Sequence, residues 1–220
     1  MKKYIALFLS AAILYSCNTG TTSSLGNSGS ANTLVTATSK QTGSVSAESI
    51  FVISDTFQTQ NNKDFVLSSL NGKPTVVGMI FTNCGYACPR LTGDMKNIAD
   101  KLKNHRDKVN FVLISFDTER DNPRQLKKFQ KEMGLDENWI LLHGSEQTVR
   151  TLSVLLNVQF EKDADGNFSH SNLITVLDKK GTLAFQKEGL DADHKETIDK
   201  IEGLLDDCCK KSQVVKAEQK

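Results

Sequence analysis

The chain has 220 residues, of which 38% are hydrophobic and 24% are charged, close to the averages of globular proteins. This length suits one domain with a tail or two small domains. The formal net charge of +1 provides no broad basic field, which argues against a nucleic-acid partner. Because the sequence contains no apolar run of about 18 residues or more, a polytopic membrane protein is excluded.

Residues 1–17 have the pattern of a lipoprotein-type signal peptide. The basic start Met1–Lys3 precedes an apolar run, Tyr4–Tyr15, that is shorter than the about 20 residues needed to span a bilayer. The following Leu14-Tyr15-Ser16-Cys17 resembles the lipobox of bacterial lipoproteins, although Tyr15 replaces a usually small residue. The resemblance implies that Cys17 is the lipidated first residue of the mature chain. The alternatives are an ordinary signal peptide, with Cys17 incidental, and an uncleaved anchor.

Residues 18–45 are predicted to form a flexible linker. They are Ser, Thr, Gly, Asn and Ala for the most part, with Lys40 as the single charge, and this composition cannot bury a core. Random-coil scaling gives the linker a reach of roughly 30 Å. A domain on such a tether would hang just above a membrane surface, which suits a partner whose working part also lies there.

Strand-like and helix-like patterns alternate through the rest of the chain. In chain order, the predicted strands are Ile50–Phe57, Lys63–Leu70, Thr75–Thr82, Asn110–Phe116, Trp139–Leu142, Val158–Phe160, Leu173–Leu177 and Thr182–Phe185. The predicted helices begin at Pro89, at Asp121-Asn122-Pro123, at Ser145 and at Asp193-His194-Lys195-Glu196. This order predicts an α/β fold: a mixed central sheet flanked by helices, with an N-terminal hairpin extension. The domain is expected to cover residues 46–209, with a polar tail at 210–220.

Two cysteines follow the apolar strand that starts at Thr75. Cys84 and Cys88 are separated by three residues and lie at the junction between this strand and the predicted helix that follows it. A helix N-terminus lowers a thiol pKa and favours thiolate. Residues at i and i+4 share one helix face, so both sulfurs can approach one soft metal ion or close a disulfide. Thiolates favour Cu(I) over hard cations, whereas structural zinc usually needs four ligands.

A third ligand is expected to be a histidine on a loop at the same edge of the sheet. His105 lies in a charged loop, His143 follows a strand, and His194 starts a helix. His170 directly precedes the strong strand Leu173–Leu177. Alone, His170 would suit a structural or surface role, but together with the cysteine pair it is the favoured ligand.

Three motifs together resemble the Sco/SenC family. They are Phe81-Thr82-x-Cys84-x-x-x-Cys88-Pro89, then Ser115-Phe116-Asp117-Thr118-Glu119-Arg120-Asp121, then His170-Ser171 before a strand. The resemblance implies a thioredoxin-like fold and a membrane-tethered copper protein of the bacterial envelope that helps to assemble the copper centre of cytochrome c oxidase. It implies Cys84, Cys88 and His170 as ligands of copper, as Cu(I) and also Cu(II). Gly85 and Asn83 depart from the proline and histidine of many relatives, which leaves the thiol acidity open.

The resemblance also implies a partner and a location. The partner is the copper-receiving subunit of a respiratory oxidase or another envelope cuproprotein. The location is the bacterial envelope, lipid-anchored, with the domain facing the periplasm or the exterior. The protein is then a metallochaperone rather than an enzyme. The alternative is a thiol–disulfide oxidoreductase that uses Cys84 and Cys88 as a redox disulfide, although the three-residue spacing favours metal binding over exchange. A peroxidase ranks below both.

Four further residues, two aspartates and two cysteines, have more than one interpretation. Asp117 ends a predicted strand, so it either tunes the thiols or His170 as a neighbour of the site, or serves as a turn residue. Asp121 is expected to be a turn or capping residue. Cys208 falls on the apolar stripe of the last helix and is expected in the core, and a functional role for it with Cys209 is not favoured.

Overall fold

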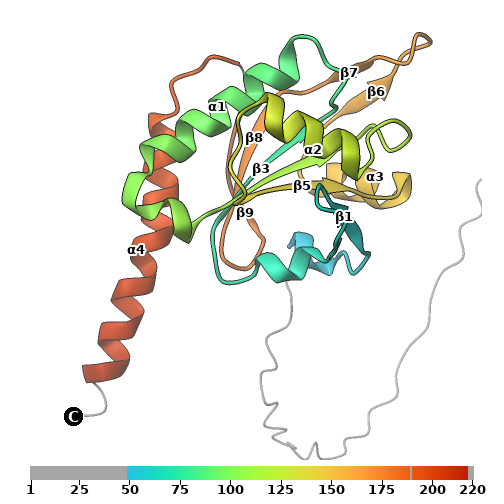
Figure 1. Ribbon diagram of the computed structural model, residues 1–220. Helices are drawn as coiled ribbons and strands as arrows, with labels where there is room; N and C mark the ends of the chain where they lie inside the picture. Colours follow the sequence, from blue (N-terminus) through green and yellow to red (C-terminus); the bar gives the residue numbers. More distant parts are fainter. Residues whose placement is uncertain (1–48, 189, 218–220) are drawn as a thin grey trace, which may run out of the picture. The chain divides into compact units, whose positions relative to one another are not determined.

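The computed structural model describes residues 49–188 and 190–217, with side chains described up to 206. Cys17, the predicted signal segment and the linker at 18–45 lie outside the described residues. The described part consists of a central sheet, a separate hairpin and helices packed on the sheet (Figure 1). No helix within these ranges is both long and apolar enough to cross a membrane.

A seven-stranded mixed sheet forms the centre, in the order β2-β1-β5-β4-β3-β8-β9. Its parallel core is β3 (Thr75–Ile80), β4 (Asn110–Ser115) and β5 (Trp139–His143). On one side β8 (Leu173–Leu177) pairs antiparallel with β3, and β9 (Leu183–Glu188) with β8. On the other side β1 (Phe57–Thr59) pairs antiparallel with β5, and β2 (Asp64–Phe65) with β1. The predicted mixed sheet and N-terminal hairpin are therefore confirmed.

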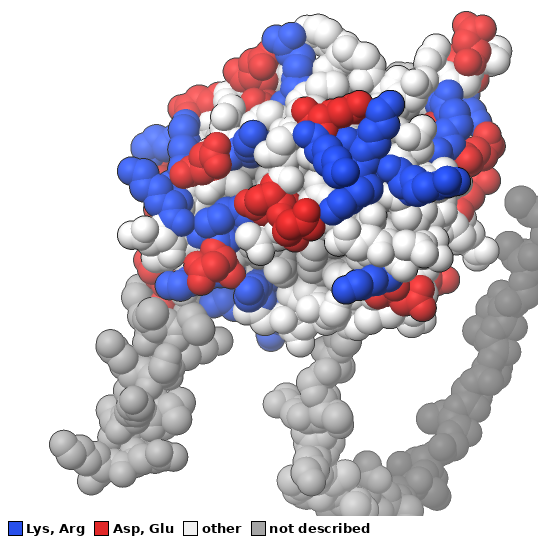
Figure 2. Space-filling view, viewed as in Figure 1, with Lys and Arg blue, Asp and Glu red and all other residues white. Residues whose placement is uncertain are grey.

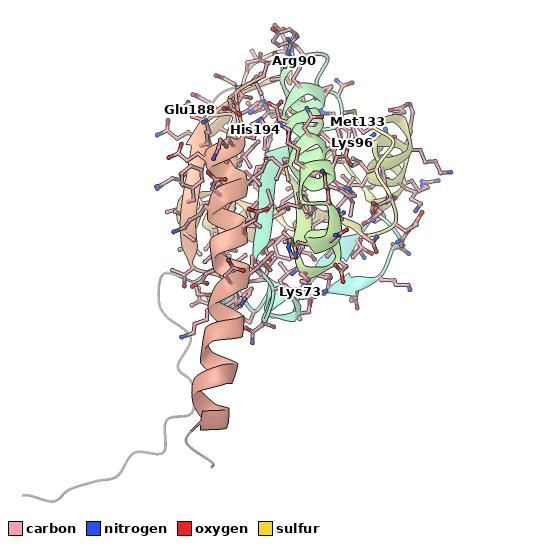
Figure 3. The ribbon with its side chains drawn as sticks, turned by 90° about the vertical axis from the view of Figure 1, so that its left-hand side faces the viewer. Lys73, Arg90, Lys96, Met133, Glu188 and His194 are labelled. Carbon is pink, nitrogen blue, oxygen red and sulfur yellow. The ribbon has the colours of Figure 1, made fainter. Side chains whose placement is uncertain are left out.

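Four α-helices complete the described part: α1 (Ala87–Lys101), α2 (Pro123–Glu132), α3 (Glu146–Leu155) and α4 (Lys195–Ala217). The crossovers β3–α1–β4 and β4–α2–β5 run in the same direction across the sheet, so their right-handedness places α1 and α2 on one face. Figure 3 looks onto α1 and α4, which pack against each other. The arrangement is the thioredoxin-like fold that the sequence led us to expect.

The continuous apolar runs are explained by burial. Every residue of β3 is buried, and so are all but the first of β4, because these two strands lie in the middle of a covered sheet. Gly78 in β3 allows close packing of α1: a Cβ there would lie 2.7 Å from Met95 Sδ and 3.3 Å from Leu113 Cδ2. The buried core therefore holds the end of β3 and the start of α1 in fixed positions.

The N-terminal prediction was wrong in part. Residues 50–52 form a short 3-10 helix, η1 (Ile50–Val52), capped where Phe51 N–H donates to Ser49 Oγ at 3.2 Å. Residues 67–70 form a second one, η2 (Leu67–Leu70), instead of extending a strand. The spacing of Leu67 and Leu70 explains this, since residues at i and i+3 share one side of a 3-10 helix and both are buried.

Three other boundaries differ from the prediction. α1 begins at Ala87, so Pro89 is its third residue; a proline there still costs no bond, because the first four N–H groups of a helix have no partner within it. α4 extends to Ala217, into the segment predicted as a polar tail. His170 does not lie in a loop: it ends β7 (Phe168–His170), which pairs with β6 (Phe160–Lys162) in a separate hairpin.

Charges of both signs are mixed on the surface. On the face shown in Figure 2, basic and acidic side chains are interspersed, in line with the formal net charge of +1. Among the described residues, exposed ion pairs form within helices, such as Lys128 with Glu132 and Arg150 with Glu146. Such pairs contribute little to stability.

Candidate metal centre

The three predicted ligands come from two separate parts of the fold. Cys84 lies in the loop between β3 and α1, Cys88 in the first turn of α1, and His170 at the end of β7. Cys88 is fully buried, whereas Cys84 and His170 are half-buried. Their sulfur and ring nitrogen atoms all lie within 4.8 Å of one another. Among the described residues this is the group of histidine, cysteine and acidic side chains that could hold a metal ion.

The backbone orients both sulfurs. The Cys88 N–H donates to Cys84 Sγ at 3.4 Å, and the Phe81 N–H donates to Cys88 Sγ, also at 3.4 Å. Cys88 Sγ lies 3.7 Å from His170 Nε2. The two thiols are free, so both sulfurs and the ring nitrogen can face one ion between them.

The His170 ring is held from its other side. Its Nδ1 lies 3.2 Å from the Ser171 carbonyl oxygen, which can accept only if Nδ1 carries the proton. That tautomer leaves the lone pair on Nε2, the atom that faces Cys88. Phe81 meets the ring edge-on at a centroid distance of 6.0 Å, and Phe116 lies 5.1 Å away. The imidazole is therefore presented with its metal-binding nitrogen toward the sulfurs.

The pKa values of the two thiols are shifted in opposite directions. Burial opposes ionisation of Cys84, but the N–H groups of Cys88, Tyr86 and Ala87 outweigh it and lower the pKa of this thiol. Burial raises the pKa of Cys88 well above its usual value, with the Phe81 N–H opposing this and the nearby Cys84 and Asp121 adding to it. The prediction that the helix start favours thiolate holds for Cys84, whereas burial reverses it for Cys88.

Asp121 closes a turn, as expected, since its N–H donates to the Asp117 carbonyl oxygen at 3.0 Å, but it does not cap a helix. Its carboxylate is only 1% exposed and accepts hydrogen bonds from the Thr82 N–H at 2.8 Å, the Thr82 hydroxyl, and the Ser115 hydroxyl at 2.6 Å. Asn122 caps α2 instead. Asp121 thus joins the end of β4 to the residue that starts the cysteine loop. The sequence signal for this role of Asp121 was the pair of hydroxyl residues, Thr82 and Ser115, at the ends of two adjacent parallel strands.

Asp117 is also buried, with 1% of its surface exposed, and its carboxylate pairs with Arg120. Its own N–H donates to Ser115 Oγ at 3.0 Å. The sequence analysis named Arg120 only as part of the family motif and gave it no role of its own. Any influence of Asp117 on the thiols or on His170 remains a prediction.

The remaining histidines lie elsewhere in the described chain. His105 is exposed on η3 (Lys103–Lys108), and His143 ends β5. His194, buried just before α4, has Nε2 3.3 Å from Asp94 Oδ1 in α1; Figure 3 labels it beside that helix. It was missed as a buried residue because the capping pattern around it suggested an exposed helix start. The side chains of Cys208 and Cys209 are outside the described set, so their predicted roles remain predictions.

Comparison in sequence identifies relatives of the domain. The family model described as SCO1/SenC matches residues 46–206. A relative from Bacillus subtilis, named SCO1 protein homolog, is 40% identical over 94 residues, which is 42% of this chain and 49% of the relative. This match therefore covers about half the length of that relative.

Solved structures agree with the sequence comparison. A SCO1/SenC family lipoprotein from Bacillus anthracis superposes with a TM-score of 0.64 and 28% identity, over 69% of this chain and 92% of the other. Bradyrhizobium japonicum ScoI with copper bound gives a TM-score of 0.60 and 25% identity, over 68% and 96%. BsSco gives 0.60 and 27%, over 68% and 90%; it is described as having a disulfide switch and as a member of the Sco family of cytochrome c oxidase assembly proteins.

The family model covers well over half of the chain, including both cysteines and His170. The resemblance that the motifs suggested is thereby confirmed, and the chain belongs to the SCO1/SenC family.

Proposed function

We propose that this protein is a copper-binding metallochaperone that delivers copper to the copper centre of a respiratory oxidase, or prepares that centre. The observation that carries the proposal is the convergence of Cys84, Cys88 and His170, with ligand atoms within 4.8 Å of one another. Two thiolates and one imidazole form a soft, three-donor set that favours Cu(I). The copper-bound Bradyrhizobium structure and the oxidase-assembly role given to the Sco family support copper as the cargo.

The unequal thiols suggest how copper enters and leaves. Cys84 is half-buried and its pKa is lowered, so it ionises more readily than Cys88 and is the thiol that incoming copper can reach first. Cys88 gives up its proton when the ion binds, since a metal ligand must be deprotonated. A recipient that presents its own thiolates can first replace Cys84, because Cys88 has no exposed surface.

The tether is part of the proposal. We place the domain in the bacterial envelope, held to the membrane by lipid on Cys17 and facing the periplasm or the exterior. The N-terminal pattern and the lipoprotein relative from Bacillus anthracis support this. Replacing Cys17 with Ser should release the protein from the membrane fraction and remove the lipid mass; unchanged fractionation and mass would refute lipidation.

Anaerobic titration of the protein with Cu(I) tests the proposed ligands, with metal measured per chain against a competing chelator. Wild type should bind one ion. Removing a residue that only orients a metal ligand lowers metal affinity by about 10–100-fold. Removing the ligand itself, as in His170→Ala, should therefore weaken copper binding by at least about tenfold. His105→Ala, on the exposed η3, is the matched control and should bind as wild type. Equal affinity of wild type and His170→Ala would refute the proposed site.

Thiol–disulfide exchange is the alternative, and the asymmetry of Cys84 and Cys88 is compatible with it. It is less well supported, because exchange needs only the two sulfurs and gives the oriented His170 no role. Redox titration decides it: a protein without a reversible Cys84–Cys88 disulfide cannot act in this way.

A further inference from the structure

Of the three proposed ligands, His170 depends on a part of the fold that the main sheet does not hold. Cys84 and Cys88 are fixed by β3 and α1, whereas His170 ends a strand whose ladder partner in the described chain is β6 alone. In Figure 1 this hairpin lies at the upper right, at one end of the sheet. β8 of the main sheet begins at Leu173, three residues after His170, but the hairpin carries His170 itself. The 3.7 Å between Cys88 Sγ and His170 Nε2 therefore depends on how the hairpin docks on the domain.

Two of the docking contacts cannot fix that position. Phe160 and Phe168 of the hairpin pack on Phe116, both at a centroid distance of 5.0 Å, but apolar packing is not directional. Lys162 pairs with Glu119 at 2.6 Å, yet the Glu119 side chain is 73% exposed. An ion pair so open to water contributes little.

Arg120 makes the directional contact. Its Nη2 donates to the carbonyl oxygen of Gly166, in the turn of the hairpin, and its Nε donates to Asp117. The guanidinium also lies over the Phe168 ring, 5.8 Å from the centroid. Asp117 is itself fixed, because it is buried and its N–H donates to Ser115 Oγ.

Asp117, which directly follows the end of β4, thus fixes one side of the guanidinium. The other side of the guanidinium holds the hairpin turn through Gly166. Gly166 has φ +80°, in a turn that Asp163 closes by accepting the N–H of Asn167 at 2.7 Å. A rigid turn transmits the position of its tip along both strands. Only a planar fork can make these two bonds together, and a lysine ammonium at the same place cannot reproduce them.

We propose that Arg120 is a positioning residue for His170, bracing the hairpin so that Nε2 stays beside Cys88 Sγ. The Arg120 side chain donates hydrogen bonds to Asp117 and Gly166, so it acts on the site through the hairpin and not through the cysteines. This inference rests on the proposed function for its meaning in copper binding, but the placement of His170 can be measured without copper.

The first test is NMR of the copper-free protein, following the ring signals of His170 and their nuclear Overhauser contacts with Phe81 and Phe116. Arg120→Ala and Arg120→Lys should both shift or broaden the ring signals and weaken those contacts. The matched control is Arg150→Ala, because Arg150 also faces the hairpin, 5.3 Å from the Phe160 centroid, but pairs with an exposed glutamate on its own helix. Unchanged His170 signals in both Arg120 variants would overturn the inference.

The second test is a double-mutant cycle on Cu(I) affinity. Arg120→Lys should lower affinity by about 10–100-fold in the wild-type background, as expected for a residue that orients a ligand. In the His170→Ala background it should have no further effect, because the ligand that Arg120 positions is already absent. Equal losses in both backgrounds would show a general structural role and overturn the inference. If the protein binds no copper, the proposed function fails while the NMR result still decides the role of Arg120.

Discussion

Asp121 offers the sharpest test of how the cysteine loop is held. Its buried carboxylate accepts three hydrogen bonds, two from Thr82 and one from Ser115, and no other contact described above joins β4 so directly to the start of that loop. Asp121→Ala removes the acceptor of all three. A net contribution of about 1 kcal/mol for each bond gives a loss of about 3 kcal/mol in the free energy of unfolding. For a domain of this size, that corresponds to a fall in Tm of about 6–12 °C.

Asp121→Asn separates hydrogen bonding from charge. The amide oxygen can still accept from the Thr82 N–H and the Ser115 hydroxyl, and the amide nitrogen can donate to the Thr82 hydroxyl. Stability should therefore fall by less than about 1 kcal/mol. The charge is lost, however, and because the Asp121 charge contributes to the raised pKa of Cys88, that pKa should fall.

Urea unfolding measures the first effect, and the pH dependence of thiolate absorbance in the ultraviolet measures the second. A surface variant of α2 such as Lys131→Ala is the control, with a change expected within about 0.5 kcal/mol. If Asp121→Ala were as stable as this control, or if Asn were as damaging as Ala, the account of Asp121 as a hydrogen-bond acceptor would be refuted.

The lowered pKa of Cys84 means that its thiolate persists at lower pH than that of an ordinary cysteine. Alkylation followed by peptide mapping should therefore show Cys84 reacting at lower pH than a free cysteine does, while buried Cys88 lags at every pH. Similar pH profiles for the two thiols would contradict this. Gly78→Ala should destabilise the domain by about 1–3 kcal/mol in urea unfolding, because its Cβ would meet Met95 Sδ at 2.7 Å. Gly93→Ala, in α1 with nothing within 4 Å of the new Cβ, should instead stabilise by about 0.5–1 kcal/mol, and a loss there would contradict the packing argument.

Local chemistry explains which elements were predicted well. β3, β4 and β8 were found because strands buried on both faces must be apolar throughout. The starts of α2 and α3 were found because Asn122 and Ser145 accept helix N–H groups, a property of those residues wherever they stand. The segments that were assigned wrongly, such as Ile50–Val52, are short and owe their shape to burial against distant parts of the chain, which no local pattern reports.

From the amino-acid sequence we could predict the α/β fold, the junction that carries Cys84 and Cys88, and, through the motif around it, the choice of His170. These features depend on residue type and on spacing within one segment. The tertiary structure alone decided which thiol is acidic, because burial outweighs the helix start at Cys88 and does not at Cys84. It alone also placed Asp121 under the cysteine loop and Arg120 on the hairpin of His170, since hydrogen bonds between segments that lie 39 and 46 residues apart are formed only when the chain has folded.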